Sequence, residues 1–528
     1  MQKIFTTAIL LAASITMMAQ ETYESATMTD QDLNGTARYV GMGGAMEALG
    51  ADISTISTNP AGIGMFRKSQ VSMSVSTQTT GQDAVLDGKK TTLSFDQIGF
   101  VFATRTDASS YLNFAFNYHK QKNFNSMLSA VGSLSEYGDN PMNFASLNKL
   151  SYMKAINGFT DNTYSTLDYL NECVVNGEGF GAYFNGSTWD TQKRQWGYTG
   201  AYDFNISGNI NNVLYLGFTA SIKDVHYNTT TNYIENISST SLELYDERSV
   251  TGTGVDFTFG AIVRPIPTSP FRFGVNISTP TWYNLRTNNT TSLTDWKPAY
   301  SQLIGNYDDA QMSESYRFRL NTPWKFGASV GHTFGTMLAL GLSYEYADWG
   351  AMDNRIIDGY DYYNGTERSK SDGIMKRHTE KTLRGVSTLK VGAELKPIPE
   401  LAVRAGYNYV SPKYKTDGYR DVELDSYGVY YSSTADYTNW KATNRLTFGL
   451  GYTKNNFSID LAYQYSCAKG EYHPFCNSYY DFDPSDILSA QEQYEVDING
   501  DNFITNYVEG KSVSNKRHQI LLTLGYRF

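Results

Sequence analysis

A short acidic stretch near the end of the chain has the spacing of a calcium-binding loop. In EVDINGDNFIT, the residues Asp497, Asn499 and Asp501 stand two positions apart. Carboxylate and amide oxygens at this spacing are the ligands that Ca²⁺ takes in such loops. The glutamate expected at the twelfth position is missing, because Val508 stands there and Glu509 follows one position later. The stretch is therefore either a calcium site or a solvated acidic loop.

The other residues able to do chemistry do not form a recognisable active site. The six histidines are scattered, and no two of them have the spacing of a metal site. The nucleophile motifs and phosphate-binding loops of known enzymes do not occur in the sequence. We therefore expect no enzymatic activity and no cofactor. The three cysteines are too few for a disulfide framework, although Cys467 and Cys476 are close enough to join in an oxidising compartment, which would leave Cys173 over.

The first residues have the features of a secretory signal. The chain begins MQKIFTTAILLAASITMMAQ, in which Lys3 precedes an apolar run that ends with the small residue Ala19. This arrangement predicts that residues 1–19 are a cleaved signal peptide. The alternative is a signal anchor, but the apolar run is short for a spanning helix. We therefore expect an exported protein.

Composition narrows the class of protein further. The net charge of -10 argues against a nucleic-acid partner, which would favour basic patches. Downstream of the signal, no apolar stretch reaches the length of about 18 residues typical of a membrane-spanning helix. Aromatic residues make up 14% of the chain, and 41 residues are tyrosines. Such a content is typical of a transmembrane β-barrel, which places aromatic side chains where it meets the membrane surface.

The end of the chain reads as an amphipathic strand. In HQILLTLGYRF, every second residue from Ile520 to Phe528 is apolar or aromatic, and the other face is mostly polar. A terminal Phe with Tyr526 two residues earlier resembles the signal that outer-membrane barrels present to their assembly machinery. The alternative is a strand of a soluble sandwich.

The same two-residue period recurs along the whole chain. About fourteen such stretches follow residue 70, each near the ~10 residues that cross a membrane at a tilt of ~45°. Short turns alternate with long loops, as in barrels that keep the short turns in the periplasm and the long loops outside. The sequence therefore predicts an all-β fold, a transmembrane antiparallel β-barrel of about 14 strands over residues 70–528. The predicted short turns lie near residues 106–109, 210–212, 264–270, 335–336, 396–400 and 453–456.

The largest of the long loops, from about residue 120 to 195, contains two helical patterns with apolar faces. At the outer mouth, these faces could form an apolar groove that collects a hydrophobic ligand. Alternatively, they pack on each other or on the barrel rim. The candidate residues of this outer ligand groove are Phe144, Leu147, Leu150, Met153, Leu167 and Leu170.

A glycine-rich segment, ARYVGMGGAMEALGADISTISTNPAGIGMF, precedes the first strand and is neither a good strand nor a good helix. Pro60 fixes one bend, and the Asn59 side chain can hydrogen-bond the turn that follows. Glycines let a backbone turn sharply and pack closely against a wall. A barrel of this size leaves a lumen that leaks unless something occupies it, so we expect the segment to act as a plug. Its charged residues are candidates for ion pairs with the lumen: Arg38, Glu47, Asp52 and Arg67.

An exported barrel preceded by the glycine-rich turn Asn59-Pro60-Ala61-Gly62 resembles the FadL/TodX family of outer-membrane channels for hydrophobic compounds. The resemblance in architecture extends over most of the chain. The specific sequence signals are this turn and the closing strand. It implies that residues 20–69 form a hatch in the lumen, with Asn59, Pro60, Ala61 and Gly62 at its gate. It also implies passive uptake of compounds such as long-chain fatty acids, which leave sideways into the membrane beside a kinked strand.

Some features depart from the family's pattern. The third strand, near residues 111–124, has no glycine to mark a kink, and several loops are long. The expected partners are a hydrophobic small molecule, outer-membrane lipid and the barrel assembly machinery. Two other functions stay open, a plugged porin for polar solutes and a surface receptor or adhesin that acts through its loops. A TonB-dependent receptor is disfavoured because it needs about twenty-two strands.

Overall fold

The computed structural model describes most of the chain after the predicted signal. The described residues are 21–81, 89–133, 186–237, 240–266, 268–294, 310–361, 363, 365–420, 424, 426, 434–475 and 508–528. Within these ranges, none of the helices combines the length and the apolar character needed to cross a membrane.

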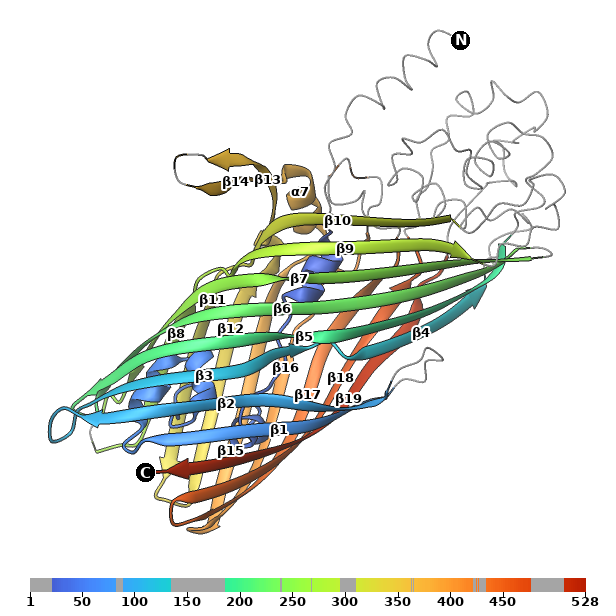
Figure 1. Cartoon of the computed structure of the whole chain (residues 1–528). Coiled ribbons are helices and arrows are strands. Elements are labelled where there is room, and N and C mark those ends of the chain that lie inside the picture. The colour runs from blue at the N-terminus through green and yellow to red at the C-terminus, as the bar shows by residue number, and fades with distance from the viewer. Residues whose placement is uncertain are drawn as a thin grey trace, which may run out of the picture.

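The strands form a single antiparallel sheet that closes on itself as a barrel of 14 strands, as predicted (Figure 1). Closure is made by the first and last strands, whose register runs from Gln70 opposite Arg527 to Thr80 opposite Arg517. In ring order, the strands are β1 (Gln70–Thr80), β2 (Thr91–Arg105), β3 (Tyr111–Asn123) with β4 (Ser126–Ser133), β5 (Gly186–Ile210), β6 (Leu214–Ile237), β7 (Thr240–Val263), β8 (Arg272–Ser278) with β9 (Trp282–Thr294), β10 (Ala310–Asn321) with β11 (Lys325–Phe334), β12 (Leu338–Asp348), β15 (Gly385–Ile398), β16 (Leu401–Val410), β17 (Tyr437–Lys454), β18 (Phe457–His473) and β19 (Lys511–Arg527).

Three members of the ring are each interrupted once. β8 and β9 are separated by residues 279–281, and β10 and β11 by residues 322–324. Pro280 and Pro323 stand at these two breaks, where each removes a backbone donor from the ladder. The third interruption separates β3 from β4 at residues 124–125, with a register shift at Lys120/Lys122 just before it.

The predicted short turns are confirmed, and all of them lie at one end of the barrel. They connect β2 to β3, β5 to β6, β7 to β8, β11 to β12, β15 to β16 and β17 to β18. Asn211, Asn212, Gly335 and Asn455 have positive φ in these turns, a conformation that Asn and Gly adopt most readily. The start of β1 and the end of β19 lie at this same end.

The outward side chains form an apolar belt around the half of the barrel next to the short turns. Leu216, Phe259 and Leu450 are among its members, each about half exposed, while their inward neighbours are buried. An apolar belt on a closed barrel, which satisfies all its backbone groups internally, is the surface that a membrane-spanning barrel turns to lipid.

Strands on one side of the barrel continue well beyond this belt. β5 has 25 residues and β6 has 24, so the expectation of strands near the minimum crossing length was wrong for them. Their far halves are rich in Thr, Asn and other polar residues, as in the stretch YNTTTNYIEN of β6. Because polar side chains on both faces suit water rather than hydrocarbon, this part of the wall stands outside the membrane.

Four further elements lie at the end of the barrel opposite the short turns. They are η4 (Trp349–Ala351), β13 (Asp353–Asp361), β14 (Thr366–Ser371) and α7 (Gly373–Thr382). β13 and β14 form a hairpin that projects away from the wall, and α7 lies beside its base (Figure 1).

Candidate functional site

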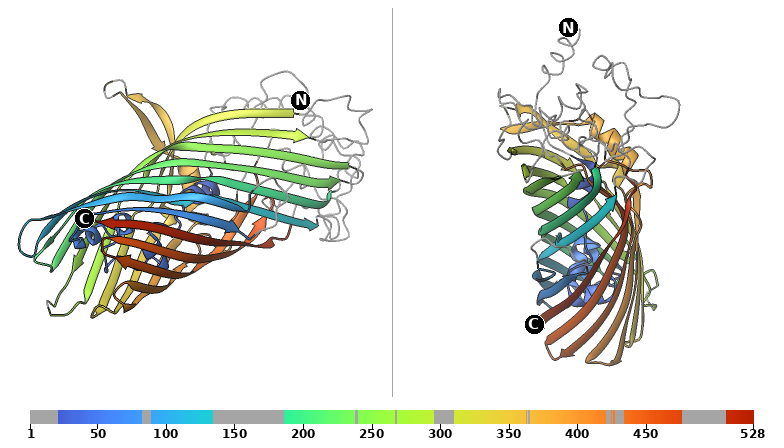
Figure 2. Two further views of the ribbon diagram at one scale, coloured as in Figure 1. Left: turned by 60° about the horizontal axis from the view of Figure 1, so that its bottom comes forward. Right: turned by 90° about the vertical axis from the view of Figure 1, so that its right-hand side faces the viewer.

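Residues 21–68, which we call the luminal segment, lie inside the barrel. The short helices of this segment, drawn in blue, are surrounded by the strands in all three views (Figures 1 and 2). The helices are α2 (Thr22–Met28), α3 (Ala37–Gly41), η1 (Ile53–Ser57) and η2 (Pro60–Met65). Their apolar side chains pack against inward residues of the wall, as Ile56 and Ile63 do beside Val101 and Ala115.

The Asn59-Pro60-Ala61 turn begins η2. The Asn59 side chain accepts a hydrogen bond from the Ala61 amide at 3.2 Å, which caps the helix. Pro60 occupies the first helical position, where its missing N–H costs nothing. Asn59, Ala61 and Gly62 are fully buried.

Polar side chains of the wall hold the backbone around this turn. The Ser207 hydroxyl donates to the Pro60 carbonyl at 2.7 Å, and the Thr219 hydroxyl donates to the Ile56 carbonyl at 2.7 Å. The Asn113 amide donates to the Ile63 carbonyl at 2.7 Å. The turn is therefore bonded to strands β3, β5 and β6.

Inward glycines let the wall approach the luminal segment closely. A Cβ atom on Gly217 would overlap the backbone of Pro60, and one on Gly260 would overlap the Asn59 side chain. On the opposite side, four glycines stand directly across from one another on neighbouring strands and face the backbone of residues 42–49. We call these four the inward glycine row: Gly331, Gly341, Gly392 and Gly406.

The predicted ion pairs of the luminal segment are found for two of the four residues. Arg38 pairs with Glu394 at 3.0 Å, and Glu47 pairs with Lys390 at 2.6 Å. The prediction was wrong for Asp52, which instead accepts hydrogen bonds from Thr36 and the Ser54 amide within the segment. It was also wrong for Arg67, which donates to the neutral Asn212 side chain because the strand end beside it offers an amide.

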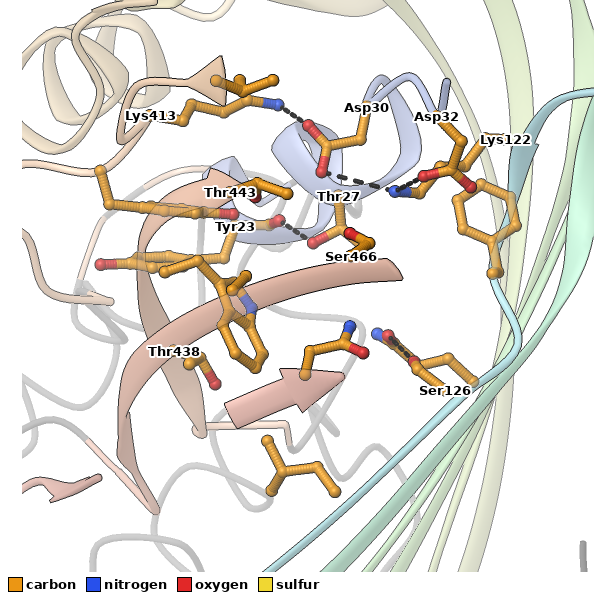
Figure 3. Close-up of a pocket in the computed structure, with 18 of the residues that line it drawn as sticks. Tyr23, Thr27, Asp30, Asp32, Lys122, Ser126, Lys413, Thr438, Thr443 and Ser466 are labelled. Carbon is orange, nitrogen blue, oxygen red and sulfur yellow. Dashed lines mark hydrogen bonds and ion pairs between the residues drawn. The ribbon is translucent and has the colours of Figure 1, made fainter. Parts of the chain in front are cut away.

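Two adjoining cavities lie between the luminal segment and the wall, and we call them together the chamber. Their volumes are about 210 and 160 Å³, and they share Asp30, Gln31, Asp32, Val386, Val410, Lys413 and Arg445 in their linings. Tyr23 of α2 stands in the chamber, with its ring stacked on Tyr414 at 5.1 Å (Figure 3).

The chamber combines aromatic rings with an excess of positive charge. Its larger cavity is lined by the carboxylates Glu24, Asp30, Asp32 and Asp436, which the cations outnumber. The aromatic lining residues are Tyr23, Phe124, Tyr227, Tyr414, Tyr437 and Trp440, and the cationic ones are Lys122, Lys193, Lys413, Arg420, Lys441, Arg445 and Arg517.

Asp32 of the luminal segment is the central anion of this lining. Its carboxylate pairs with Lys122 at 3.1 Å and with Arg517 at 3.2 Å, and it accepts a hydrogen bond from the backbone N–H of Asn123. Burial alone would raise the pKa of this carboxyl, but the nearby Lys122, Arg517 and Arg445 hold that pKa well below its usual range. Asp32 is therefore ionised at neutral pH.

The wall beside Asp32 contains a gap in strand pairing. β2 pairs with β3 only as far as Gln97 opposite His119, and β4 pairs with β5 alone. The stretch 91–96 of β2 therefore faces residues 120–133 without a backbone ladder between them. We call this gap the seam.

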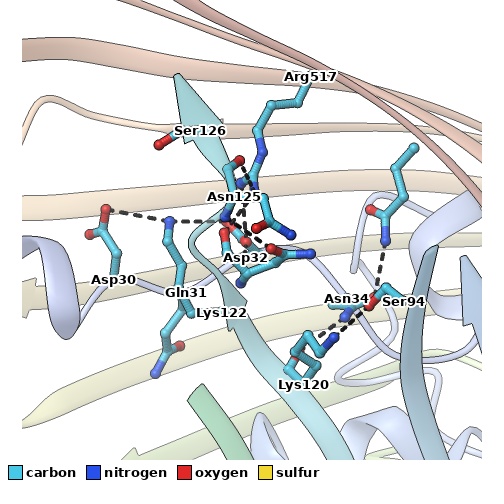
Figure 4. A network of polar contacts seen from close by, with 12 residues as sticks. Asp30, Gln31, Asp32, Asn34, Ser94, Lys120, Lys122, Asn125, Ser126 and Arg517 are labelled. Atoms are coloured by element: carbon cyan, nitrogen blue, oxygen red, sulfur yellow. Dashed lines mark hydrogen bonds and ion pairs between the residues drawn. The ribbon is translucent and has the colours of Figure 1, made fainter. Parts of the chain in front are cut away.

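Side chains close the seam in place of backbone hydrogen bonds (Figure 4). The Asn34 amide of the luminal segment donates to the Asp96 side chain at 2.9 Å and to the Lys120 carbonyl at 3.0 Å. The Lys120 ammonium donates to the Ser94 hydroxyl at 2.7 Å. Arg517 donates to the Asn123 carbonyl at 2.6 Å. The luminal segment is thus part of the closure of the wall.

Sequence reasoning did not find the seam, because β3 contains no glycine. The signal lies on the neighbouring strand, where Gly197 of β5 has a φ of 109° and accepts a hydrogen bond from the Phe124 amide. A glycine with positive φ inside a strand marks an irregular ladder.

Several predicted site residues lie outside the described residues. These are the six candidates for the outer ligand groove between Phe144 and Leu170, and the calcium candidates Asp497, Asn499 and Asp501. Cys467 is a free thiol, while Cys476 and Cys173 are not described. Among the described residues, no three His, Cys, Asp or Glu side chains are grouped as a metal site.

Comparison with known proteins gave matches among solved structures alone. No family model and no curated protein matches the sequence. The toluene transporter TbuX of Ralstonia pickettii is 13% identical, with 94% of this chain and 99% of that chain covered and a TM-score of 0.48. The P. putida toluene transporter TodX has 13% identity, 94% and 99% coverage and a TM-score of 0.47. A FadL homologue of Pseudomonas aeruginosa has 14% identity, 97% and 99% coverage and a TM-score of 0.49. These similarities concern the fold, and they assign no function to individual residues of this chain.

Proposed function

We propose that the protein is an outer-membrane channel for the passive uptake of hydrophobic compounds, with long-chain fatty acids as the first candidates. The apolar belt suits a barrel that spans a membrane, and the luminal segment fills the lumen that an aqueous pore would need. The chamber between the segment and the wall offers a place for a ligand.

The lining of the chamber is the observation that carries this proposal. Aromatic rings suit an apolar chain, and an excess of cations suits an acidic group at one end of it. A fatty acid has both features in one molecule. A neutral hydrocarbon would use the rings alone and make no use of the excess positive charge.

Lys325 is the cation best placed to receive such an acidic group. It lines the smaller cavity, and among the described residues no carboxylate lies within ion-pair distance of it. It is the first residue of β11, directly after the break at Pro323. An incoming carboxylate would give this ammonium a charge-assisted partner.

The seam offers the route from the chamber to the membrane. Asn123, Ser126, Met127 and Gln195 line the larger cavity and stand at the seam or next to it. Release of Asp32 from Arg517 and Lys122 would free the bent third strand and widen the gap in the wall. A ligand that leaves sideways into lipid does not have to enter the water at the short-turn end of the barrel. Such an exit suits a hydrophobic compound better than a polar one.

Extraction of the natively purified barrel, with mass spectrometry of the extract, tests the proposal. We expect an apolar acid at up to one molecule per barrel. Empty barrels that also fail to bind added oleate would contradict the proposal.

A matched pair of variants tests the role of the cation. Lys325→Gln should weaken oleate binding about tenfold, the loss of one charge-assisted hydrogen bond of about 1.5 kcal/mol, and leave binding of a neutral alkane unchanged. Lys370→Gln, on the exposed hairpin, is the control. Equal oleate affinity in both variants would show that Lys325 does not contribute to oleate binding.

A plugged porin for polar solutes is the second candidate. The polar and charged residues of the chamber favour it, since water and small ions would be stable there. Steady ion conductance of the intact protein in planar bilayers, without added ligand, would support the porin and contradict the first proposal.

A further inference from the structure

Two neighbouring strands of the wall are interrupted at the same level, by residues 279–281 on one and by residues 322–324 on the other. The ladders on either side of these residues have one continuous register, which places Pro280 opposite Pro323. Neither proline can donate a backbone hydrogen bond, so the wall is incompletely bonded at this level. We call the two stretches together the proline break.

Threonine hydroxyls take the place of part of the missing ladder. The backbone N–H of Thr281 donates to the Thr322 hydroxyl at 2.8 Å. On the side of β7, the backbone N–H of Phe257 donates to the Thr279 hydroxyl at 3.0 Å. Each of these bonds is released when one side chain rotates, whereas a regular ladder opens only when a whole strand moves. The proline break is therefore easier to part than the ladders on either side of it.

The proline break lies at the edge of the apolar belt that faces away from the short turns. Outward side chains change from apolar to polar across it, from Phe326 on β11 to Arg317 and Arg319 on β10. Trp282 and Trp324 flank the break on the outer face, and each is nearly half exposed. Tryptophan is typical of the membrane interface. The break therefore stands where hydrocarbon gives way to lipid headgroups.

The smaller cavity of the chamber reaches the proline break from inside. Ser278, Thr279, Thr281 and Lys325 all belong to its lining. The larger cavity reaches the seam, as described above. The chamber therefore adjoins the wall at two irregular places, the proline break and the seam.

The charges inside the proline break suit an incoming acidic group. Lys325 follows the break directly on β11 and lines the smaller cavity. The carboxylates that line this cavity near it have other partners. Asp256 pairs with Lys223 at 3.6 Å, and Glu345 lies 3.9 Å from the Lys390 ammonium. An acidic group that crosses the break meets hydroxyls first and an ammonium next.

We propose that the proline break is a lateral entrance, through which an amphiphilic acid dissolved in the membrane reaches the chamber. This inference rests on the proposed function and adds the place where the compound enters. An amphiphilic acid keeps its acidic group among the headgroups and its chain in the hydrocarbon, the two levels that meet at the break. The acidic group passes between the threonines to Lys325, and the chain follows. The seam is then the exit.

A disulfide across the break tests the proposal in the full barrel. The three native cysteines are changed to serine, and Thr281→Cys/Thr322→Cys is added as a lock. Residues directly opposite each other on antiparallel strands are close enough for a disulfide. The control pair, Phe273→Cys/Val330→Cys, joins β8 to β11 within their regular ladder.

Arrival of a photoreactive oleate analogue in the chamber is measured in nanodiscs, with the analogue supplied in the membrane. Samples are irradiated at intervals, and mass spectrometry measures the label on the peptide that contains Tyr23. The oxidised lock should slow labelling by about tenfold or more relative to its reduced form, because a covalent bond holds the two strands together. The control pair should be labelled at one rate in both forms. Equal rates in both forms of the lock would overturn the proposal.

Removal of one closing bond should have the opposite effect. Thr322→Val keeps the shape of the side chain but cannot accept the hydrogen bond from Thr281. Labelling should be about fivefold faster, which corresponds to the loss of one neutral hydrogen bond. Thr366→Val, on the exposed hairpin, should be labelled as the wild type is. An unchanged or slower rate in Thr322→Val would also contradict the entrance.

The final extent of labelling separates this proposal from the proposed function. Chamber peptides that are fully labelled in every variant, at rates that the lock does not change, would show that the compound binds and enters elsewhere. Chamber peptides that stay unlabelled in every variant would contradict the proposed function and the entrance together.

Discussion

Single polar residues, rather than the glycine-rich turn, connect the luminal segment to the seam. Asp32 and Asn34 are two positions apart in the sequence, and each bonds to the third strand while also reaching another strand. Because Asp32 faces both Lys122 and Arg517, its loss would leave two cations close together. We therefore expect the charge of this carboxylate to affect how firmly the seam is held closed.

Asp32→Asn should loosen the seam at neutral pH. Breaking one side of a buried ion-pair cluster costs roughly 3 kcal/mol. Here Arg517 would lose its carboxylate partner, and Lys122 would keep only Asp30 at 3.7 Å. We expect a higher and noisier ion conductance in planar bilayers. Asp358→Asn, on the exposed hairpin, should behave as the wild type, and equal conductance of all three proteins would contradict this role.

Acid should have the same effect as that substitution. Because the pKa of Asp32 is lower in the folded protein than its ordinary value of about 3.9, the stabilisation from its ion pairs is complete above that value. It is lost as the pH falls through the lowered pKa. Wild-type conductance should stay flat from pH 7 to about 4.5 and rise only below about pH 4. A rise near pH 6 would point to a histidine instead.

At the scale of elements, the wall strands were predictable and the course of the luminal segment was not. Alternation of apolar residues fixes which face of a strand meets lipid, so Leu446, Phe448 and Leu450 could be placed on the outside from the sequence. The segment follows no period, because its backbone is held by wall side chains such as Ser207 and Asn113 that are distant in the sequence. The seam is of the same kind, and only Gly197 indicated it.

Gly217→Ala should displace the Asn59-Pro60-Ala61 turn. A methyl group at this position would overlap the Pro60 backbone, and such overpacking costs about 1–3 kcal/mol. We expect faster proteolysis within residues 36–66, measured by limited digestion in detergent. Gly373→Ala, at the start of α7 and with no close backbone neighbour, is the control. Equal digestion of both variants would mean that the turn has room to move.

At the scale of the whole molecule, the backbone ladders of the ring are complete without the luminal segment. Every strand of the ring has its ladder partners on other strands, and no strand pairs with the luminal segment. Deletion of residues 21–66 should therefore leave an assembled barrel, seen as a heat-modifiable band on a gel. Its conductance should be high and steady, and a pore that stays closed would refute the assignment of this segment as a plug.

The fold was predicted correctly as a barrel of 14 strands. The length of its longest strands was not predicted. Counting apolar alternation gives the part of a strand that meets lipid, and the polar far halves of β5 and β6 lack that pattern. The chamber could not be predicted either, because Tyr23, Lys413 and Arg517 line it together although they are distant in the sequence.

The inward glycine row has a consequence for biogenesis. The wall at Gly341 and Gly392 lies against the backbone of residues 42–45 with no room for a methyl group. Such close contact disfavours insertion of the folded luminal segment into a barrel that has already closed. The ring closes where β1 meets β19, and the luminal segment leads directly into β1. We expect the barrel to enclose residues 21–68 while β1 and β19 pair. The luminal segment would then enter the lumen during assembly, before any ligand does.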